Sequence, residues 1–210
     1  ILSLTLIFSF IYCQKLSPRP INGEQLVNHL GYSLSYNEKH EQANWVFYEL
    51  TIDEVLGSVI RKDQFRADPN IKTGTASLSD YKRSGYDRGH LAPAADMKWS
   101  SVAMSESFFM SNISPQTPSF NRGVWKKLEN LVRKWAVENK SLYIVTGGIL
   151  IDGLKTIGNN EVSIPDYFYK VILDNNSLDL KVIAFIIPNK KSSKLLFEYA
   201  TSVDNVEDKT

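Results

Sequence analysis

One stretch, residues 81–129, constrains this chain most, because it gathers chemically active side chains within otherwise small or apolar sequence. Its motifs are Asp87–His90 (DRGH), Asn112–Gln116 (NISPQ) and Asn121–Trp125 (NRGVW). A histidine accepts a proton near neutral pH, because its unperturbed pKa is about 6.5. An asparagine offers a neutral oxygen to a hard cation such as Mg²⁺. Together these residues predict metal-assisted attack of water on a phosphate.

Hydrophobic patterning around this stretch predicts a single α+β domain. A chain of 210 residues with 43% hydrophobic content is long enough for one sizeable core. Helices are predicted within residues 96–109, beyond Pro118 and after Ser202, while residues 79–85 have a turn-like composition. Runs of strand length occur at residues 32–36, 44–51, 141–147, 167–173, 180–187 and, more briefly, 197–202.

The helix after Pro118 has an apolar stripe and a basic flank. The stripe has helical spacing and should face the core. The cations fall mostly on the other flank, where a solvated face is favoured over phosphate contacts. The stripe is Trp125, Leu128, Val132 and Trp135, and the cations are Lys126, Lys127, Arg133 and Lys134.

Charge is distributed unevenly along the chain. The formal net charge is +1, yet residues 81–140 contain ten Lys/Arg and five Asp/Glu, a net charge of +5. A basic central third fits a polyanionic partner, although such a segment is more often a solvated face.

The three motifs resemble those of the DNA/RNA non-specific endonucleases, a family that includes bacterial secreted sugar-non-specific nucleases and mitochondrial endonuclease G. They occur in the family's order and at roughly its spacing, and the resemblance extends over about residues 36–207. It implies a central, mainly antiparallel sheet and a ββα-metal motif in which the segment ending at His90 is a strand. It also implies DNA and RNA as substrates.

The resemblance, taken with side-chain chemistry, assigns three central roles. His90 would act as general base towards the attacking water. Asn121, at the start of the second helix, would be the direct protein ligand of a single Mg²⁺, with Mn²⁺ as an alternative ion. Glu129, two turns further along a similar side, would hold the waters of the metal.

The neighbouring residues receive supporting roles. Arg88 would contact the phosphate with its planar guanidinium. A second phosphate contact is expected from Arg61 or Arg66, with a weak preference for Arg61. Asp87 is expected to orient the turn, and Gly89 to allow a close backbone approach.

The N-terminal segment predicts export. Residues 1–13 are uncharged, apolar and too short to span a bilayer, as in the core of a secretory signal peptide whose start precedes this sequence. Cleavage after Cys13 would release a secreted or periplasmic protein without stable membrane association; a lipid anchor on Cys13 is the alternative. A buried first strand is a further, less favoured reading.

Next, residues 14–35 are expected to form a flexible lead-in and residues 36–210 the nuclease domain. The family usually continues beyond the position of Thr210 with an aromatic-rich tail. His29 and His40 are expected at the surface, and a homodimer remains open.

Three other functions compete with this assignment. A zinc enzyme is disfavoured by a single Cys and the lack of a His-Glu-x-x-His helix, and a two-metal nuclease by the lack of clustered carboxylates in residues 81–129. A nucleic-acid-binding protein without catalysis is the rival of another class. His90, Asn121 and Glu129 argue against it, because binding alone requires none of them.

Overall fold

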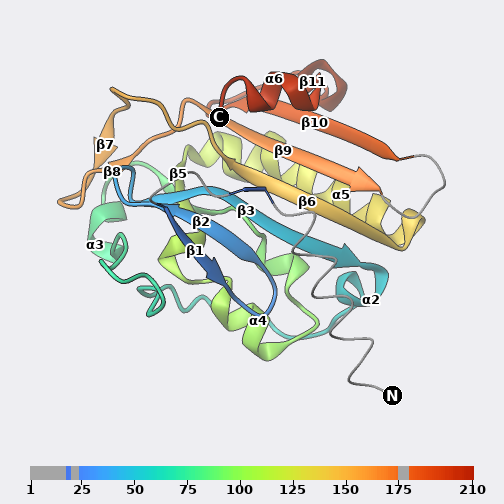
Figure 1. Cartoon of the computed structure of the whole chain (residues 1–210), viewed down its shortest axis with the longest axis horizontal. Helices are drawn as coiled ribbons and strands as arrows, with labels where there is room; N and C mark the ends of the chain where they lie inside the picture. Colours follow the sequence, from blue (N-terminus) through green and yellow to red (C-terminus); the bar gives the residue numbers. More distant parts are fainter. Residues whose placement is uncertain (1–17, 20–23, 175–179) are drawn as a thin grey trace.

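The fold is built on a long antiparallel sheet, as Figure 1 shows for the computed structural model. The structure describes residues 18–19, 24–174 and 180–210. In that part of the chain, seven strands pair in the order β1-β2-β3-β6-β9-β10-β11, all antiparallel. Their bounds are β1 Gln25–Asn28, β2 Ser33–Asn37, β3 Gln42–Thr51, β6 Ser141–Gly148, β9 Tyr167–Asp174, β10 Lys181–Pro188 and β11 Ala200–Thr201.

Helices and two short ribbons complete the mixed α+β architecture. Helix α5, Lys126–Asn139, lies against one face of the sheet (Figure 1). The ribbons are β4 Asp87–His90 with β5 Ile113–Gln116, and β7 Thr156–Ile157 with β8 Val162–Ser163. The other helical segments are α2 Ile52–Val55, α3 Leu78–Tyr81, η1 Ala94–Asp96, α4 Ser101–Glu106, η2 Met110–Asn112, η3 Phe120–Trp125, η4 Leu196–Tyr199 and α6 Val203–Glu207.

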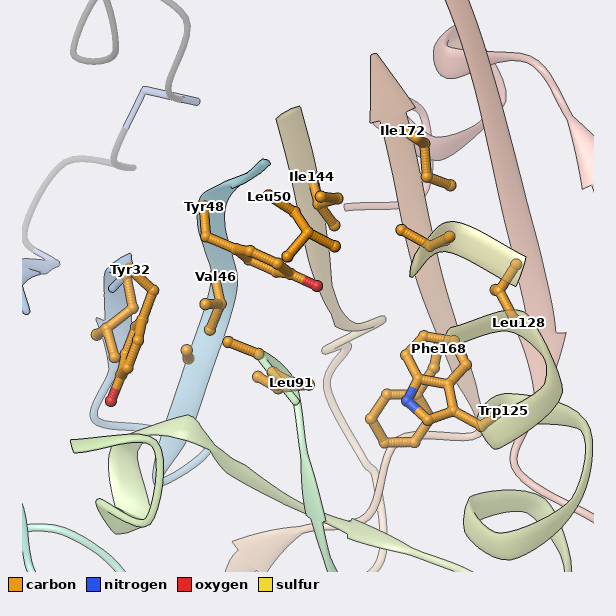
Figure 2. Packing of buried hydrophobic residues seen from close by; sticks show 14 of the residues in the cluster. Tyr32, Val46, Tyr48, Leu50, Leu91, Trp125, Leu128, Ile144, Phe168 and Ile172 are labelled. Atoms are coloured by element: carbon orange, nitrogen blue, oxygen red, sulfur yellow. The ribbon is translucent and has the colours of Figure 1, made fainter. Parts of the chain in front are cut away.

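The main core fills the space between this sheet face and α5. Alternate residues of a strand point to the same face, so Phe168 and Ile172 of β9 both turn inward. In Figure 2 they lie near Trp125 and Leu128 from the helical side. The Trp125 and Phe168 ring centroids are 5.8 Å apart, so the junction of η3 and α5 is packed directly onto β9.

The lead-in predicted for residues 14–35 is wrong over its second half. Residues from Gln25 onward form β1 and the start of β2, which pair at the edge of the sheet. Val27 is buried there, so apolar packing and ladder hydrogen bonds fix this segment. The signal segment and lipid anchor predicted at residues 1–13 lie outside the described residues.

The surface positions predicted for His29 and His40 are also wrong. The His29 side chain is buried, and its Nε2 lies 2.8 Å from Asp68 Oδ2. His40 is buried as well, with Nδ1 2.8 Å from Ser163 Oγ. Both contacts join residues far apart in sequence, so local composition carried no sign of them.

Several predicted boundaries shift. The helix-compatible residues 96–109 contain only the six-residue α4, capped by the Ser100 hydroxyl at the Val102 and Ala103 amides. Residues 79–85 overlap the short helix α3, and residues 197–202 are divided between the helical turn η4 and the short strand β11. The second regular helix begins at Lys126 rather than at Asn121, because the backbone at Gly123 has non-helical angles. No helix in the described part of the chain is long and apolar enough to cross a membrane.

Candidate active site

The ribbon of β4 and β5 carries His90 at the end of a strand. The strands pair antiparallel, with Asp87 opposite Gln116 and His90 opposite Ile113. The chain then passes through η3 into α5, so two strands and a helix follow one another. This is the ββα order that the motif resemblance implies.

Gly89 is required by a close approach within this ribbon. A Cβ atom added at Gly89 would lie 2.1 Å from the Gln116 side-chain carbon Cδ. Real Cβ contacts never come this close, so any side chain here would push β4 and β5 apart. The expected structural role of Gly89 therefore has a specific cause, the Gln116 amide packed over it.

His90 occupies an aromatic niche at the end of β4. Only 9% of the residue is exposed. Its ring centroid lies 5.5 Å from that of Phe65 and 5.0 Å from that of Phe108. Burial, reinforced by the nearby cations Arg61 and Arg88, lowers the pKa of His90 to about 3. Its Nε2 has no hydrogen-bond partner among the described residues, so a neutral ring nitrogen is left to accept a proton.

Asp87 connects this strand to η3. Its carboxylate accepts a 2.9 Å hydrogen bond from Asn121 Nδ2 and bonds of 2.8 and 2.6 Å from Nε and a terminal nitrogen of Arg122. Burial alone would raise the pKa of Asp87, but these hydrogen bonds outweigh it and lower the pKa below its usual value. Because the Asn121 nitrogen is the donor, the side-chain oxygen Oδ1 is the atom left to bind a cation.

Glu129 lies one helical turn beyond Trp125, on the same side of the helix. Burial raises the pKa of its carboxyl group, while the positive charges of Lys170, Arg133 and Arg61 oppose that rise. Asn121, before the start of α5, and Glu129, in its first turn, both carry side-chain oxygen atoms, which are the donor type that Mg²⁺ prefers. Within the described ranges, no group of three or more His, Cys, Asp or Glu side chains could hold a metal ion.

The three candidate arginines have different surroundings. Arg88 is exposed, and its guanidinium carbon Cζ lies 4.3 Å from the Phe65 ring centroid, beside His90. Arg61 forms an exposed 2.6 Å ion pair with Asp63, and its charge acts on His90. Arg66 instead donates hydrogen bonds of 2.8 and 3.0 Å to Ser105 and lies over another ring. Arg88 and Arg61 therefore lie close enough for their charges to act on His90, whereas the Arg66 guanidinium is hydrogen-bonded to α4.

A buried network beneath α5 was not predicted. Arg133 forms a 2.6 Å ion pair with Asp96, which also accepts a 2.9 Å hydrogen bond from the Tyr48 hydroxyl. The Arg133 side chain is 17% exposed, so its expected place on a solvated flank is wrong. It lies four residues after Glu129, and that i, i+4 spacing could have indicated the common side.

Asn112 is another functional neighbour to which the sequence analysis gave no role. Its side-chain oxygen accepts from the Ala92 amide, and its nitrogen donates to the Ala92 and Ser107 carbonyls, all at 2.9 Å. These bonds fix the segment that leaves His90. The NISPQ motif contained the residue, but only the folded chain shows what its amide holds.

Comparisons with known proteins agree with this geometry. A family model described as DNA/RNA non-specific endonuclease matches residues 17–210. "Nuclease EXOG, mitochondrial" from Danio rerio is 38% identical over 185 residues, covering 81% of this chain and 54% of its own length. Human "Endonuclease G, mitochondrial" is 33% identical over 178 residues, covering 79% and 60%. A crystal structure described as the EndoG/EndoGI complex matches with a TM-score of 0.88 and 30% identity, over 95% of this chain and 88% of that one.

These relatives correct the predicted location of the protein, and the chain matches only part of their length. The expected secreted or periplasmic location is wrong, because the zebrafish, mouse and human relatives are named as mitochondrial proteins. An apolar run near the N-terminus does not by itself distinguish a secretory signal from other targeting segments. The chain spans about half the length of the curated relatives it matches.

Proposed function

We propose that this chain, which belongs to the family of DNA/RNA non-specific endonucleases, hydrolyses phosphodiester bonds of DNA and RNA with a single bound Mg²⁺. The main support for this proposal is the environment of His90. It is a buried, neutral histidine whose Nε2 has no hydrogen-bond partner among the described residues, and two cationic side chains lie nearby. The names of the relatives also support a mitochondrial location, which cell fractionation would test.

His90 acts as general base. Its low pKa keeps it neutral at physiological pH, so it is always able to accept a proton, but as a weak base. A phosphate anion bound beside it favours the protonated form and strengthens the base when substrate is present. Arg88 and Arg61 hold that phosphate, because both bring positive charge to the same ring.

Asn121 and Glu129 would hold the cation, Asn121 directly through Oδ1 and Glu129 through water. A Mg²⁺ ion held by these residues, or Mn²⁺ in its place, would supply positive charge beside the phosphate and acidic water to the leaving group. Asp87 fixes the Asn121 amide by the 2.9 Å hydrogen bond, so Oδ1 is oriented before the ion binds.

Little base preference is expected. The proposed contacts all fall on phosphate, and phosphate contacts position a nucleic acid without reading its sequence. Binding should also weaken with salt, since each neutralised phosphate releases counterions. Both DNA and RNA therefore fit the same site.

The test compares cleavage of plasmid DNA and RNA with Mg²⁺ and with a chelator. Asn121→Ala should need more Mg²⁺ for half-maximal cleavage, and His90→Ala should lose about 10²- to 10⁴-fold in rate at any metal concentration. His40→Ala is the matched control, because it removes another buried histidine outside the site. Chelator-resistant cleavage would refute the metal mechanism, whereas binding without cleavage would favour the non-catalytic rival.

A further inference from the structure

Lys170 occupies a position where the fold calls for an apolar residue. It lies on β9 between Phe168 and Ile172, and all three point to the helix-facing side of the sheet. Across the neighbouring strands it is paired with Thr146 and Phe185, both buried. Figure 2 shows Phe168 and Ile172 turned into the core on this side.

The Lys170 ammonium group is buried without a hydrogen-bond partner in the described part of the chain. The residue is 1% exposed. Moving a charged group from water into the core costs several kcal/mol, and attraction to an opposite charge must offset that cost. An unbranched apolar side chain would fill this space without that cost, so packing does not explain a lysine here.

The position of the ammonium group links it to Glu129. Its nitrogen Nζ lies 4.9 Å from the Trp125 ring centroid, and Glu129 lies one turn further along the same side of α5. The carboxylates of Glu129 and Asp96 act on the ammonium as opposite charges, and Asp96 is already paired with Arg133. Glu129 is therefore the acid that remains for Lys170.

We propose that Lys170 is a positioning residue of the nuclease site: its positive charge, held over Trp125 inside the core without a direct hydrogen bond to Glu129, orients the Glu129 carboxylate for the metal-bound waters. This inference rests on the proposed role of Glu129. Lys170 touches neither substrate nor metal and acts only through that carboxylate. Groups that orient a metal's ligands typically change metal affinity or activity by about 10- to 100-fold when removed.

The test replaces Lys170 with methionine, which has similar length and no charge. Lys170→Met should raise the dissociation constant for Mn²⁺, measured calorimetrically without substrate, by about tenfold or more. It should lower kcat while leaving KM for DNA near the parent value. Its melting temperature is not diagnostic, because removing the buried ammonium and leaving the Glu129 carboxylate without its cation change stability in opposite directions. Ile172→Met, the next inward position of β9, controls for repacking the same face.

A double substitution separates positioning from packing. If Lys170 acts through Glu129, Lys170→Met should have little further effect on kcat in a Glu129→Gln background. Equal losses in both backgrounds, or a Lys170→Met protein with the parent's Mn²⁺ affinity and kcat, would overturn the inference. Should Lys170→Met not fold, Lys170→Gln, which keeps a donor but removes the charge, is measured in the same way. Full activity of Glu129→Gln would instead refute the proposed role of Glu129 itself.

Discussion

The buried state of His90 makes a measurable prediction about stability and pH. In the unfolded chain a histidine has an ordinary pKa of about 6.5, whereas in the folded protein the pKa of His90 is about 3. Between these values the unfolded chain binds a proton that the folded protein does not. The contribution of His90 to the free energy of unfolding is therefore present above the unfolded pKa and is lost as pH falls towards the folded one.

The magnitude follows from the two pKa values. Between pH 7 and pH 5 the unfolded histidine becomes almost fully protonated while folded His90 stays neutral, which removes about 2 kcal/mol of stability. Urea unfolding followed by tryptophan fluorescence, without metal or nucleic acid, measures this loss in the parent and in His90→Gln. The other two histidines remain in both proteins, so their effects cancel in the comparison.

The parent should lose about 2 kcal/mol more than His90→Gln over this interval. The absolute stability of His90→Gln is not diagnostic, because a buried amide costs stability at every pH. Equal losses in the two proteins would refute the reasoning. A parent that gains stability relative to the variant on acidification would show that a negative partner, not burial, controls His90.

Two further predictions concern the surroundings of this residue. Gly89→Ala should lower both activity and melting temperature, because the added Cβ meets Gln116, and Gln116→Ala should partly restore both in the double variant; an unchanged Gly89→Ala would refute the close approach. Arg61→Ala should raise KM for DNA with little change in melting temperature, whereas Arg66→Ala should lower the melting temperature with little change in KM, as kinetics and thermal unfolding can check.

The sequence predicted those parts of the fold that repeat locally. Apolar runs at residues 141–147 and 167–173 became β6 and β9 almost to the residue, because buried strands have continuous hydrophobic character. The lead-in failed for the opposite reason. Its strands are held by pairing at a sheet edge and by His29, whose partner Asp68 lies 39 residues away.

The candidate site divides in a similar way. The DRGH and NRGVW motifs made His90 and Asn121 candidates, because the residue types themselves indicate a proton acceptor and an oxygen ligand. Of the residues behind them, Arg133 lies on the same helix as Glu129, where the i, i+4 spacing was available, but Lys170 lies on a separate strand that meets Glu129 only when the helix packs on β9. Lys170 did leave one signal: it interrupts the inward-facing alternation of an otherwise apolar strand.

The period of the strand explains how one tetrapeptide serves two purposes. Successive residues of β4 point to opposite faces, so Arg88 and His90 share one face and Asp87 and Gly89 share the other. The first face meets the Phe65 ring and carries the proposed proton and phosphate chemistry. The second face has a structural role: Asp87 is hydrogen-bonded to η3, and Gly89 leaves room for the Gln116 side chain of β5. A one-residue shift in register would exchange these faces, so the close contact at Gly89 also fixes which side of the strand carries the proposed chemistry.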